Sequence, residues 1–323
     1  MLTVGVDVGG TRVRAGVVDA TGRVMDRRRA ATPAGDEVLE DVVTAQVAEL
    51  VEEHRAVPGR AGAVAAIGVA VAGFVAADRR TVLFSPHLSW RGVAVADRIE
   101  RRVGLPVLLE HDANAAAVAE HRFGAAGGAR VAMLVAIGTG IGGALLVGGE
   151  LYRGAHGVAP ELGHLRAVPD GRPCPCGKRG CWERYCSGPG LATTTLELLA
   201  RSGAASGSLA REVAADPRRL SGHRVAAAAR EGDPVGVRAM AELARWLGEG
   251  LALVADLFDP EVVVVGGGVS ESAPLFLDEA RERYAAVVTG AGHRPLARIR
   301  TSQLGEDAGV VGAALLARSL IAR

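Results

Sequence analysis

Hydrophobic and polar residues alternate along the first part of the chain in a pattern typical of β-strands. Leu2–Val8 and Arg12–Asp19 both alternate, and a pair of glycines lies between them. This arrangement predicts a hairpin with a tight turn, and Arg23–Met25 is expected to add a third strand. From Asp36 to Glu53 the apolar residues recur at helical spacing instead, which predicts a helix.

The same strand–turn–strand pattern returns near the middle of the chain. The apolar run Val131–Ile137 leads into a glycine-rich turn, Gly138–Gly143, and Ala144–Val147 is apolar again. Between the two hairpins, Ala63–Val71 and Pro106–Glu110 have the apolar composition of buried strands. Two similar hairpins with strands and helices between them predict two related α/β halves.

Helices are predicted in both halves of the chain. Asp112–Phe123 is rich in alanine and ends at a glycine, and Val235–Phe258 has apolar residues at helical spacing. A strand is expected at Glu261–Val265, and a final helix at Ala308–Ala322 is apolar enough to pack against a domain. Ser202–Gly207 is small and polar, which predicts a loop.

Composition and charge narrow the class of protein. The 323 residues include 37 Lys and Arg against 36 Asp and Glu, giving a net charge of +1, which gives no general attraction to nucleic acid or to a membrane. No apolar run approaches the ~20 residues of a membrane helix, and Asp7 interrupts the first apolar run, so no signal peptide is expected. With 49% hydrophobic residues, the chain is expected to be a soluble cytoplasmic protein of about two domains.

Glycine is abundant, with 44 residues, and three glycine clusters each follow an apolar strand. Backbone N–H groups approach phosphate closely only where a Cβ is absent, so the three turns together predict a nucleotide site. Arg12 is placed to neutralise phosphate charge, and Asp7 to hold Mg²⁺ directly or through water. Taken singly, each cluster is better explained as a plain hairpin turn. The predicted nucleotide-binding residues are Asp7, Gly9, Gly10, Thr11, Arg12, Gly138, Thr139, Gly140, Gly266, Gly267 and Gly268.

A second candidate site is a group of thiols with one imidazole. His164, Cys174, Cys176 and Cys181 follow the spacing H-x9-C-x-C-x4-C, with prolines and glycines between them. Four nitrogen and sulfur ligands are what Zn²⁺ prefers at a closed, structural site. Reduced surface cysteines and a nucleic-acid zinc ribbon are the other interpretations, and the even charge argues against the ribbon. Cys186 is expected to stand outside the group as a small apolar filler.

Carboxylates near these motifs are candidates for acid–base chemistry and for binding. Asp112 lies between a predicted strand and a predicted helix, where its side chain either caps the helix or acts as a general base toward a hydroxyl. Glu161 lies three residues before His164, and Glu183 follows Cys181 closely, so a zinc loop would brace both glutamates against one pocket. Ordinary surface glutamates are the simpler interpretation of this pair.

Taken together, these motifs resemble the ROK family (repressors, open reading frames, kinases), and most nearly its actinobacterial glucokinases. The resemblance extends nearly from end to end of the chain. It is carried by Val6–Arg12, which is similar to the family's DxGGTK phosphate turn, Glu110–Glu120 (ENDANAAALAE), Ile137–Gly143 (GTGxGGG), Gly157–His164 with Cys174–Ser187 (the signature ending in CxCGxxGCWExxxSG), and Leu257–Ser270 (LFDPxxxxxGGGVS).

The resemblance implies an α/β fold of the actin-like ATPase type (ribonuclease H-like, hexokinase-type), with two domains and a central cleft. Residues 1–112 would form a small domain, with a C-terminal helix at about 305–323 packed back on it. Residues 113–304 would form a large domain that carries the zinc loop. Because the family usually forms dimers or tetramers, a homodimer or homotetramer is expected.

The resemblance also implies a function, the Mg²⁺- and ATP-dependent phosphorylation of a hexose, most of all glucose at its 6-hydroxyl. Asp112 would be the general base. Zn²⁺ on His164 and the three cysteines would be structural, and His164 would contact the sugar as well. The residues expected to contact the sugar are Gly73, His111, Asp112, Glu161, His164 and Glu183.

Three positions depart from the family's motifs. Arg12 stands for the usual Lys, His87 for the Asn of the PNLxW loop, and His111 for the Asn before the base. An amide and a neutral imidazole offer their donor and acceptor in different places, and an unsatisfied hydrogen bond costs roughly 1–3 kcal/mol. Weaker glucose affinity than is usual in the family, or a different preferred hexose, is therefore expected.

Two alternatives remain open. One is a ROK kinase for another sugar, such as mannose, N-acetylmannosamine or allose. The other is a sugar-sensing protein without turnover, against which the intact Asp112 and the absence of a DNA-binding module before the first strand both argue.

Overall fold

The computed structural model describes residues 1–55, 63–201 and 207–321. Apart from Gly207, the loop predicted at Ser202–Gly207 lies outside these residues. The chain forms two compact units. The first unit holds residues 1–134, 144–160 and 303–323, and the second holds residues 135–143 and 161–302. Among the helices described, none is both long enough and apolar enough to cross a bilayer.

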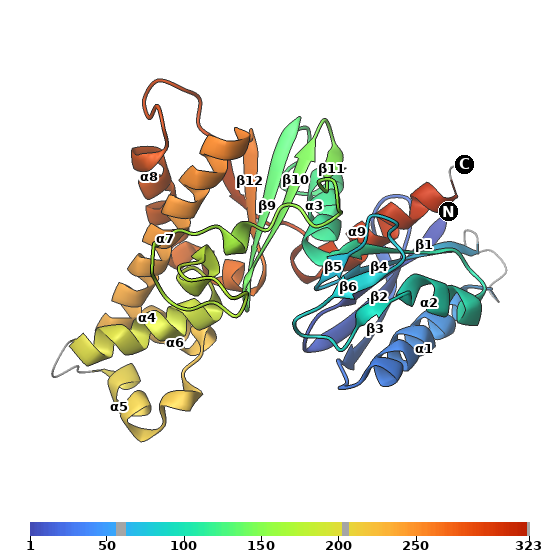
Figure 1. The fold of residues 1–323 in the computed structure, drawn as a ribbon, viewed down its shortest axis with the longest axis horizontal. Coiled ribbons are helices and arrows are strands. Elements are labelled where there is room, and N and C mark those ends of the chain that lie inside the picture. The colour runs from blue at the N-terminus through green and yellow to red at the C-terminus, as the bar shows by residue number, and fades with distance from the viewer. Residues whose placement is uncertain (56–62, 202–206, 322–323) are drawn as a thin grey trace. The chain divides into compact units, whose positions relative to one another are not determined.

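A mixed five-stranded sheet forms the centre of the first unit (Figure 1). The strands β1, β4 and β8 are parallel, whereas β2 and β3 add antiparallel neighbours. The predicted hairpin and buried strands are confirmed, but the third strand runs to Ala31 instead of ending at Met25. The spatial order is β3 (Val24–Ala31), β2 (Arg12–Val18), β1 (Leu2–Val8), β4 (Val64–Val71) and β8 (Val107–His111).

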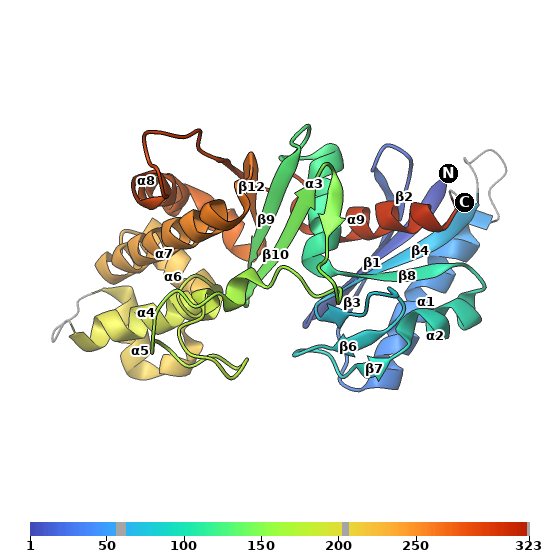
Figure 2. The same ribbon diagram turned by 45° about the horizontal axis from the view of Figure 1, so that its top comes forward.

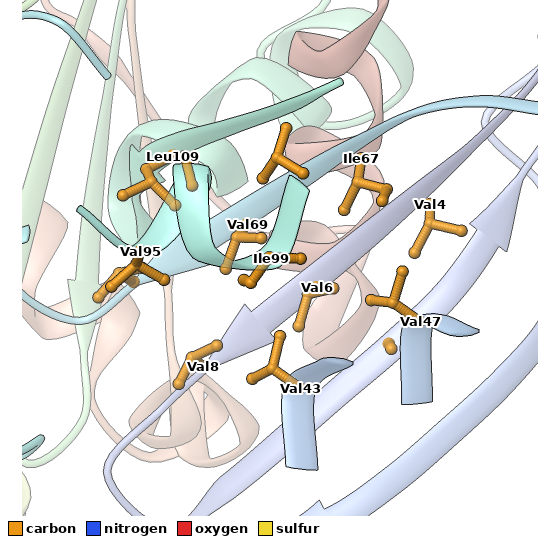
Figure 3. Packing of buried hydrophobic residues seen from close by; sticks show 14 of the residues in the cluster. Val4, Val6, Val8, Val43, Val47, Ile67, Val69, Val95, Ile99 and Leu109 are labelled. Atoms are coloured by element: carbon orange, nitrogen blue, oxygen red, sulfur yellow. The ribbon is translucent and has the colours of Figure 1, made fainter. Parts of the chain in front are cut away.

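One face of this sheet packs against two helices, α1 (Asp36–Arg55) and α2 (Val95–Val103). Val4, Val6 and Val8 alternate along β1 with smaller or polar residues, and all three meet apolar side chains of the helices (Figure 3). These valines are fully buried. Each side chain buried to this extent contributes roughly 1.5–3 kcal/mol, so this face supplies much of the stability of the unit.

The opposite face of the sheet depends on glycine. Helix α9 (Ala308–Ala317) lies along β1 and β4 (Figure 2). A Cβ at Gly5 or at Gly68 would lie 1.9 Å from a carbonyl oxygen of this helix, so only glycine permits the approach. Helix α3 (Asp112–Phe123), which has the predicted bounds, packs against α9. The C-terminal helix therefore returns to the first sheet.

A small three-stranded sheet lies beyond β4 in the sequence. It is formed by β5 (Phe74–Val75), β6 (Val82–Phe84) and β7 (Arg91–Val93), in that order. Periodicity does not predict strands of two or three residues, because so short a run carries no repeat. The loop between β6 and β7 carries His87.

The second sheet has the same spatial order of strands as the first. Its hairpin strands come first, and its central strand β9 is followed by β12 and β13, as β1 is followed by β4 and β8. This order confirms the predicted pair of related α/β halves. The order is β11 (Glu150–Tyr152), β10 (Ile141–Val147), β9 (Val131–Ile137), β12 (Val262–Gly266) and β13 (Arg298–Thr301).

The rest of the second unit is mainly helical, as predicted. Helix α7 (Pro234–Phe258) is its longest helix among the residues described, and Asp233 caps it by accepting the N–H groups of Val235 and Gly236. The helices that contact α7 include α4, α6 and α8 (Figure 1). The bounds are α4 (Gly188–Arg201), α5 (Ser208–Ala215), α6 (Gly222–Arg230) and α8 (Leu277–Val287).

The two compact units differ in extent from the predicted domains. Helix α3 lies in the first unit, although a boundary at Asp112 would put it in the large domain. The β9 and β10 strands pass from one unit into the other. The domain boundary at Asp112 stays a prediction.

Candidate active site

Three predicted residues lie at one edge of the first sheet because three parallel strands end there. Asp7 is near the end of β1, Gly73 follows β4, and Asp112 follows β8. The register pairs Asp7 of β1 with Ala70 of β4, and it pairs Ala70 with Glu110 of β8. The carboxyl ends of parallel strands are where α/β sheets place their ligands.

The first glycine turn closes the β1–β2 hairpin and is held by its own backbone. Gly9 donates its N–H to the carbonyl of Arg12 at 3.0 Å, and the hydroxyl of Thr32 donates to the carbonyl of Gly9 at 2.6 Å. Gly10, Thr11 and Arg12 are exposed. The structure thus shows a hairpin turn that is held by hydrogen bonds and has an exposed tip. This geometry agrees both with a plain hairpin turn and with a phosphate site.

The loop that carries His87 lies against this turn. A Cβ at Gly10 would lie 3.0 Å from the Cβ of His87. One of the two histidines that depart from the family's motifs therefore borders the first glycine turn.

Asp7 has an unusual electrostatic environment. Burial and then the negative charge of Asp112 raise the pKa of Asp7 to about 6, while the Arg14 guanidinium, 3.4 Å from its Oδ2, acts in the opposite direction. Two carboxylates that repel each other form a site where a divalent cation would relieve both. The donor set therefore fits Mg²⁺, which binds carboxylates together with phosphate oxygens.

Glu110, directly before His111 and Asp112, is a buried carboxylate that several side chains contact. Glu110 Oε2 accepts two hydrogen bonds from Arg153, at 2.6 and 3.0 Å, and lies 3.2 Å from Arg79. Its Oε1 accepts the side-chain amide of Asn114 at 2.9 Å. Burial acts to raise the pKa of Glu110, but the hydrogen bonds and charge of Arg153 and the charge of Arg79 outweigh it and lower the pKa below its ordinary value. This network fixes the end of β8.

Asp112 is the first residue of α3 and remains accessible. Its side chain is 41% exposed, and its Oδ1 accepts the N–H of Ala113 at 2.7 Å. The Nε2 of His111 lies 3.2 Å from the same oxygen. A helix cap accepts an N–H two or three residues ahead, so the bond to Ala113 only partly resembles a cap. The assignment of Asp112 as the base stays a prediction.

Gly73 is placed where a side chain does not fit. A Cβ there would lie 2.6 Å from the carbonyl oxygen of Phe84 and 2.8 Å from the Cβ of Ser85. The glycine lets the chain after β4 pass close to the small sheet, and its predicted contact with sugar stays a prediction.

The second and third glycine turns lie next to each other in the second unit. Gly267 has a φ of +80°, and a Cβ there would lie 2.4 Å from the carbonyl oxygen of Ile137, at the end of β9. Gly188, at the start of α4, donates its N–H to the carbonyl of Gly138 at 2.9 Å. Two of the three predicted phosphate turns are thereby brought together at the ends of β9 and β12.

The predicted thiol–imidazole group is assembled in the second unit. One ligand atom from each of His164, Cys174, Cys176 and Cys181 lies within 4.8 Å of all the others. Two of the separations are 3.6 Å (Cys176 Sγ to Cys181 Sγ) and 3.7 Å (Cys174 Sγ to His164 Nδ1). A tetrahedral zinc ion with Zn–S bonds of about 2.3 Å requires ligand separations of about 3.5–3.8 Å, which these two separations match, and three thiols with one imidazole are a donor set that zinc prefers.

Cys186 lies outside this group, as expected. It is fully buried and 4.0 Å from the carbonyl oxygen of Leu243 on α7. Burial raises the pKa of its thiol. All four cysteines are free thiols.

The imidazole of His164 faces two different sets of groups. Its Nδ1 lies 3.7 Å from Cys174 Sγ and 3.7 Å from Glu183 Oε1, whereas its Nε2 lies 3.9 Å from Glu161 Oε2. The structure therefore brings together the three predicted sugar-binding residues of the second unit. Glu183 also lies over the second glycine turn, because a Cβ at Gly140 would be 2.7 Å from its Oε2.

Sequence reasoning missed three arginines of this site. Arg79 and Arg153 hold Glu110, and Arg14 lies beside Asp7. Arg153 lies just before the Gly157–His164 motif, but the sequence gives no signal that it reaches back to β8. Arg79 sits in a turn with a φ of +58° and has no sequence signal at all.

Two sheets of equal strand order, each with glycine turns at the ends of its strands, define an α/β fold of the actin-like, hexokinase type. The chain belongs to the ROK family, whose family model matches residues 3–319. The predicted family and fold class are therefore confirmed.

Similar proteins of known structure or name cover nearly the whole chain. A ROK family glucokinase from Streptomyces griseus, solved in complex with glucose and AMPPNP, has a TM-score of 0.85 at 44% identity, covering 99% of this chain and 100% of that chain. A ROK hexokinase from Thermus thermophilus has a TM-score of 0.82 at 32% identity, covering 99% of both chains. A glucokinase of Streptomyces coelicolor is 42% identical over 98% of both chains.

Proposed function

We propose that the protein is an ATP-dependent hexose kinase, and specifically a glucokinase that makes glucose 6-phosphate. The observation that carries this proposal is the full-length similarity, at 44% identity, to a glucokinase solved with glucose and a nucleotide analogue. The glycine turns, the accessible Asp112 and the Glu161–His164–Glu183 group supply the kinds of residue that this reaction needs.

Phosphate and magnesium would be held by the glycine turns and by Asp7. The exposed tip Gly10–Arg12 offers backbone N–H groups and a guanidinium, which suit phosphate oxygens. Asp7 would hold Mg²⁺ directly or through water, and the ion would supply positive charge next to the phosphate. In the second unit, the turns at Gly138–Gly140 and Gly266–Gly268 would bind the remainder of the nucleotide.

Asp112 would act as the general base. As the sugar 6-oxygen forms a bond to the γ-phosphorus, the bond from phosphorus to the ADP oxygen breaks, and the hydroxyl proton passes to the carboxylate of Asp112. An accessible carboxylate at the start of α3 is suited to this transfer, because a backbone hydrogen bond fixes its position.

The sugar would be bound in part by the second unit. Glu161 and Glu183 would accept hydroxyl hydrogen bonds, and His164 would present Nε2 to the sugar while Nδ1 binds zinc. A bound Zn²⁺ supplies rigidity here and no reacting group, since four protein ligands leave no open position.

The test is turnover of the purified full-length chain with Mg·ATP and a panel of glucose, mannose, N-acetylmannosamine and allose. Coupled ADP release would be measured for each sugar, and the product identified by glucose 6-phosphate dehydrogenase. Glucose-dependent ADP release with glucose 6-phosphate as product is expected. Release with another sugar alone would reject glucose, and sugar binding by calorimetry with no ADP release would indicate a sensor.

Three further expectations belong to this proposal. They are assembly as a homodimer or homotetramer, a cytoplasmic location, and structural Zn²⁺. The thiol–imidazole geometry supports the last of these. Analytical ultracentrifugation and elemental analysis test assembly and metal content directly.

A further inference from the structure

The junction between β8 and α3 holds a contact that the family's motif does not contain. His111 occupies the position of the family's Asn, directly before Asp112. Its Nε2 lies 3.2 Å from Asp112 Oδ1, and its side chain is 20% exposed against 41% for Asp112. The imidazole is therefore half-buried beside the more accessible carboxylate.

The two oxygens of Asp112 are not equivalent. Oδ1 accepts the backbone N–H of Ala113 at 2.7 Å and faces His111 as well. Among the residues that the structure describes, no hydrogen bond or ion pair is found at Oδ2. One oxygen is thus held by the protein and the other is left for a ligand.

The backbone that carries this pair is itself fixed. His111 donates its N–H to Glu110 Oε1 at 3.2 Å, and Arg153 and Arg79 hold the other oxygen of Glu110. His111 also ends β8, where it aligns with Val71 of β4. A side chain on so rigid a segment can hold its neighbour in one orientation.

We propose that His111 is a positioning residue for Asp112, holding Oδ1 through Nε2 so that Oδ2 receives the proton of the attacking hydroxyl. This inference rests on the proposed function, because it deepens the role given there to Asp112. The contact is attractive when Nε2 carries a hydrogen, and the neutral ring then has Nδ1 as an acceptor. The competing assignment gives His111 the role of the family's Asn, with its ring contacting the sugar.

Glutamine and asparagine separate the two assignments. The amide nitrogen of Gln reaches about as far as the Nε2 of His, whereas that of Asn reaches about as far as Nδ1. If His111 positions Asp112, only Gln supplies the donor where the contact is made. If His111 replaces the family's Asn toward the sugar, Asn supplies it instead.

The kinetic test compares His111→Ala, His111→Gln and His111→Asn, with His223→Gln on the exposed surface of α6 as the control. We expect His111→Ala to lower kcat about tenfold with KM for ATP unchanged, since small misplacements of a reacting group have effects of this size or larger. Gln should recover most of the lost kcat, and Asn should not. Recovery by Asn but not by Gln, or a change confined to KM for the sugar, would overturn the proposal.

A second measurement does not depend on turnover. Nitrogen-15 NMR of the eight histidines, with His111 assigned by its loss in His111→Gln, reports which ring nitrogen carries hydrogen. We expect a hydrogen on Nε2 of His111 and a shift of its signal in Asp112→Ala. A hydrogen on Nδ1 alone, or a signal indifferent to Asp112→Ala, rejects the positioning role. An inactive wild type with the expected NMR result would reject the kinase and leave the contact established.

Discussion

The two candidate regions, one in each compact unit, are built by different means. In the first unit, carboxylates at the ends of β1 and β8 are held by arginines and by backbone N–H groups. In the second unit, Glu161 and Glu183 lie beside thiols and an imidazole in a loop with little regular structure. The first region contains repulsion between Asp7 and Asp112, whereas the second brings together four residues that could hold a metal ion.

This difference indicates how each region responds to its ligands. A cation relieves the repulsion between Asp7 and Asp112 in the first region without needing to order it, because the neighbouring strands already fix these side chains. The loop of the second region buries Leu162 and Trp182, but its segment Cys174–Cys181 contains no helix or strand, so a metal bound there would order this segment.

Replacing Asp112 with Ala should abolish turnover. Loss of a general base lowers rates by about 10²–10⁴-fold, so kcat should fall at least a hundredfold. The fold should survive, because the Asp112 side chain is 41% exposed. ADP release and circular dichroism would be measured together, with His223→Gln as the matched surface control. Retention of more than a tenth of the rate would remove Asp112 as the base.

Removing the metal should loosen the second unit alone. Cys176→Ser and Cys181→Ser, or a strong chelator, are expected to lower Tm by roughly 10 °C, since each kcal/mol is worth about 2–4 °C in a domain of this size. Hydrogen exchange should rise in the segment Glu161–Ser187 and stay unchanged in the first sheet. Cys186→Ala is the control for losing a thiol that lies outside the group. Unchanged melting, together with no zinc by elemental analysis, would refute the site.

Removing the metal is expected to destabilise the second unit, whereas removing the charge of Asp7 is expected to stabilise the first. Because burial raises its pKa from 3.8 to about 6, the folded chain binds a proton that the unfolded chain releases between these values. Stability therefore falls as pH rises from about 4 to 6, and above that the ionised Asp7 costs up to about 3 kcal/mol.

Asp7→Asn should thus stabilise the metal-free protein at pH 7 and lose turnover. The gain should vanish below about pH 4, where Asp7 is neutral in both states. Urea unfolding at pH 4, 6 and 7.5 in the presence of a chelator would measure it. A stability difference independent of pH would contradict the raised pKa.

Much of the fold followed from local sequence pattern. The bounds of α3 and β9 agree with those predicted, because each is a complete apolar or alanine-rich run ended by glycine. The third strand was predicted too short because Arg27, Arg28 and Arg29 interrupt the apolar alternation. In the structure these arginines pair with carboxylates of α1 and of the segment before α9, which no local pattern indicates.

In the candidate site, too, only the features with a local sequence pattern were predicted. The thiol–imidazole group and the glycine turns were predicted because their members are close together in the sequence. The clamp on Glu110 was not predicted, because Arg153 lies 43 positions away along the chain. The approach of Gly267 to Ile137 was missed for the same reason. Site residues that are close together in the sequence form a motif that can be recognised. An ion pair between distant residues forms no such motif.

The smallest expected effect concerns His87, which borders the first glycine turn. Restoring the family's residue with His87→Asn would return an amide that can donate and accept in one plane. If the imidazole leaves one sugar hydroxyl unsatisfied, KM for glucose should fall about fivefold, equivalent to about 1 kcal/mol, with kcat little changed.

The matched control for this change is Ser89→Ala, in the same exposed loop. A change in kcat with constant KM would place His87 with the phosphate turn instead of the sugar, since Gly10 lies directly against it. In that case the departure at His87 would act on nucleotide binding, and the sugar preference of the chain would rest on the second unit. Saturation curves for glucose and for ATP, measured in parallel, distinguish the two outcomes.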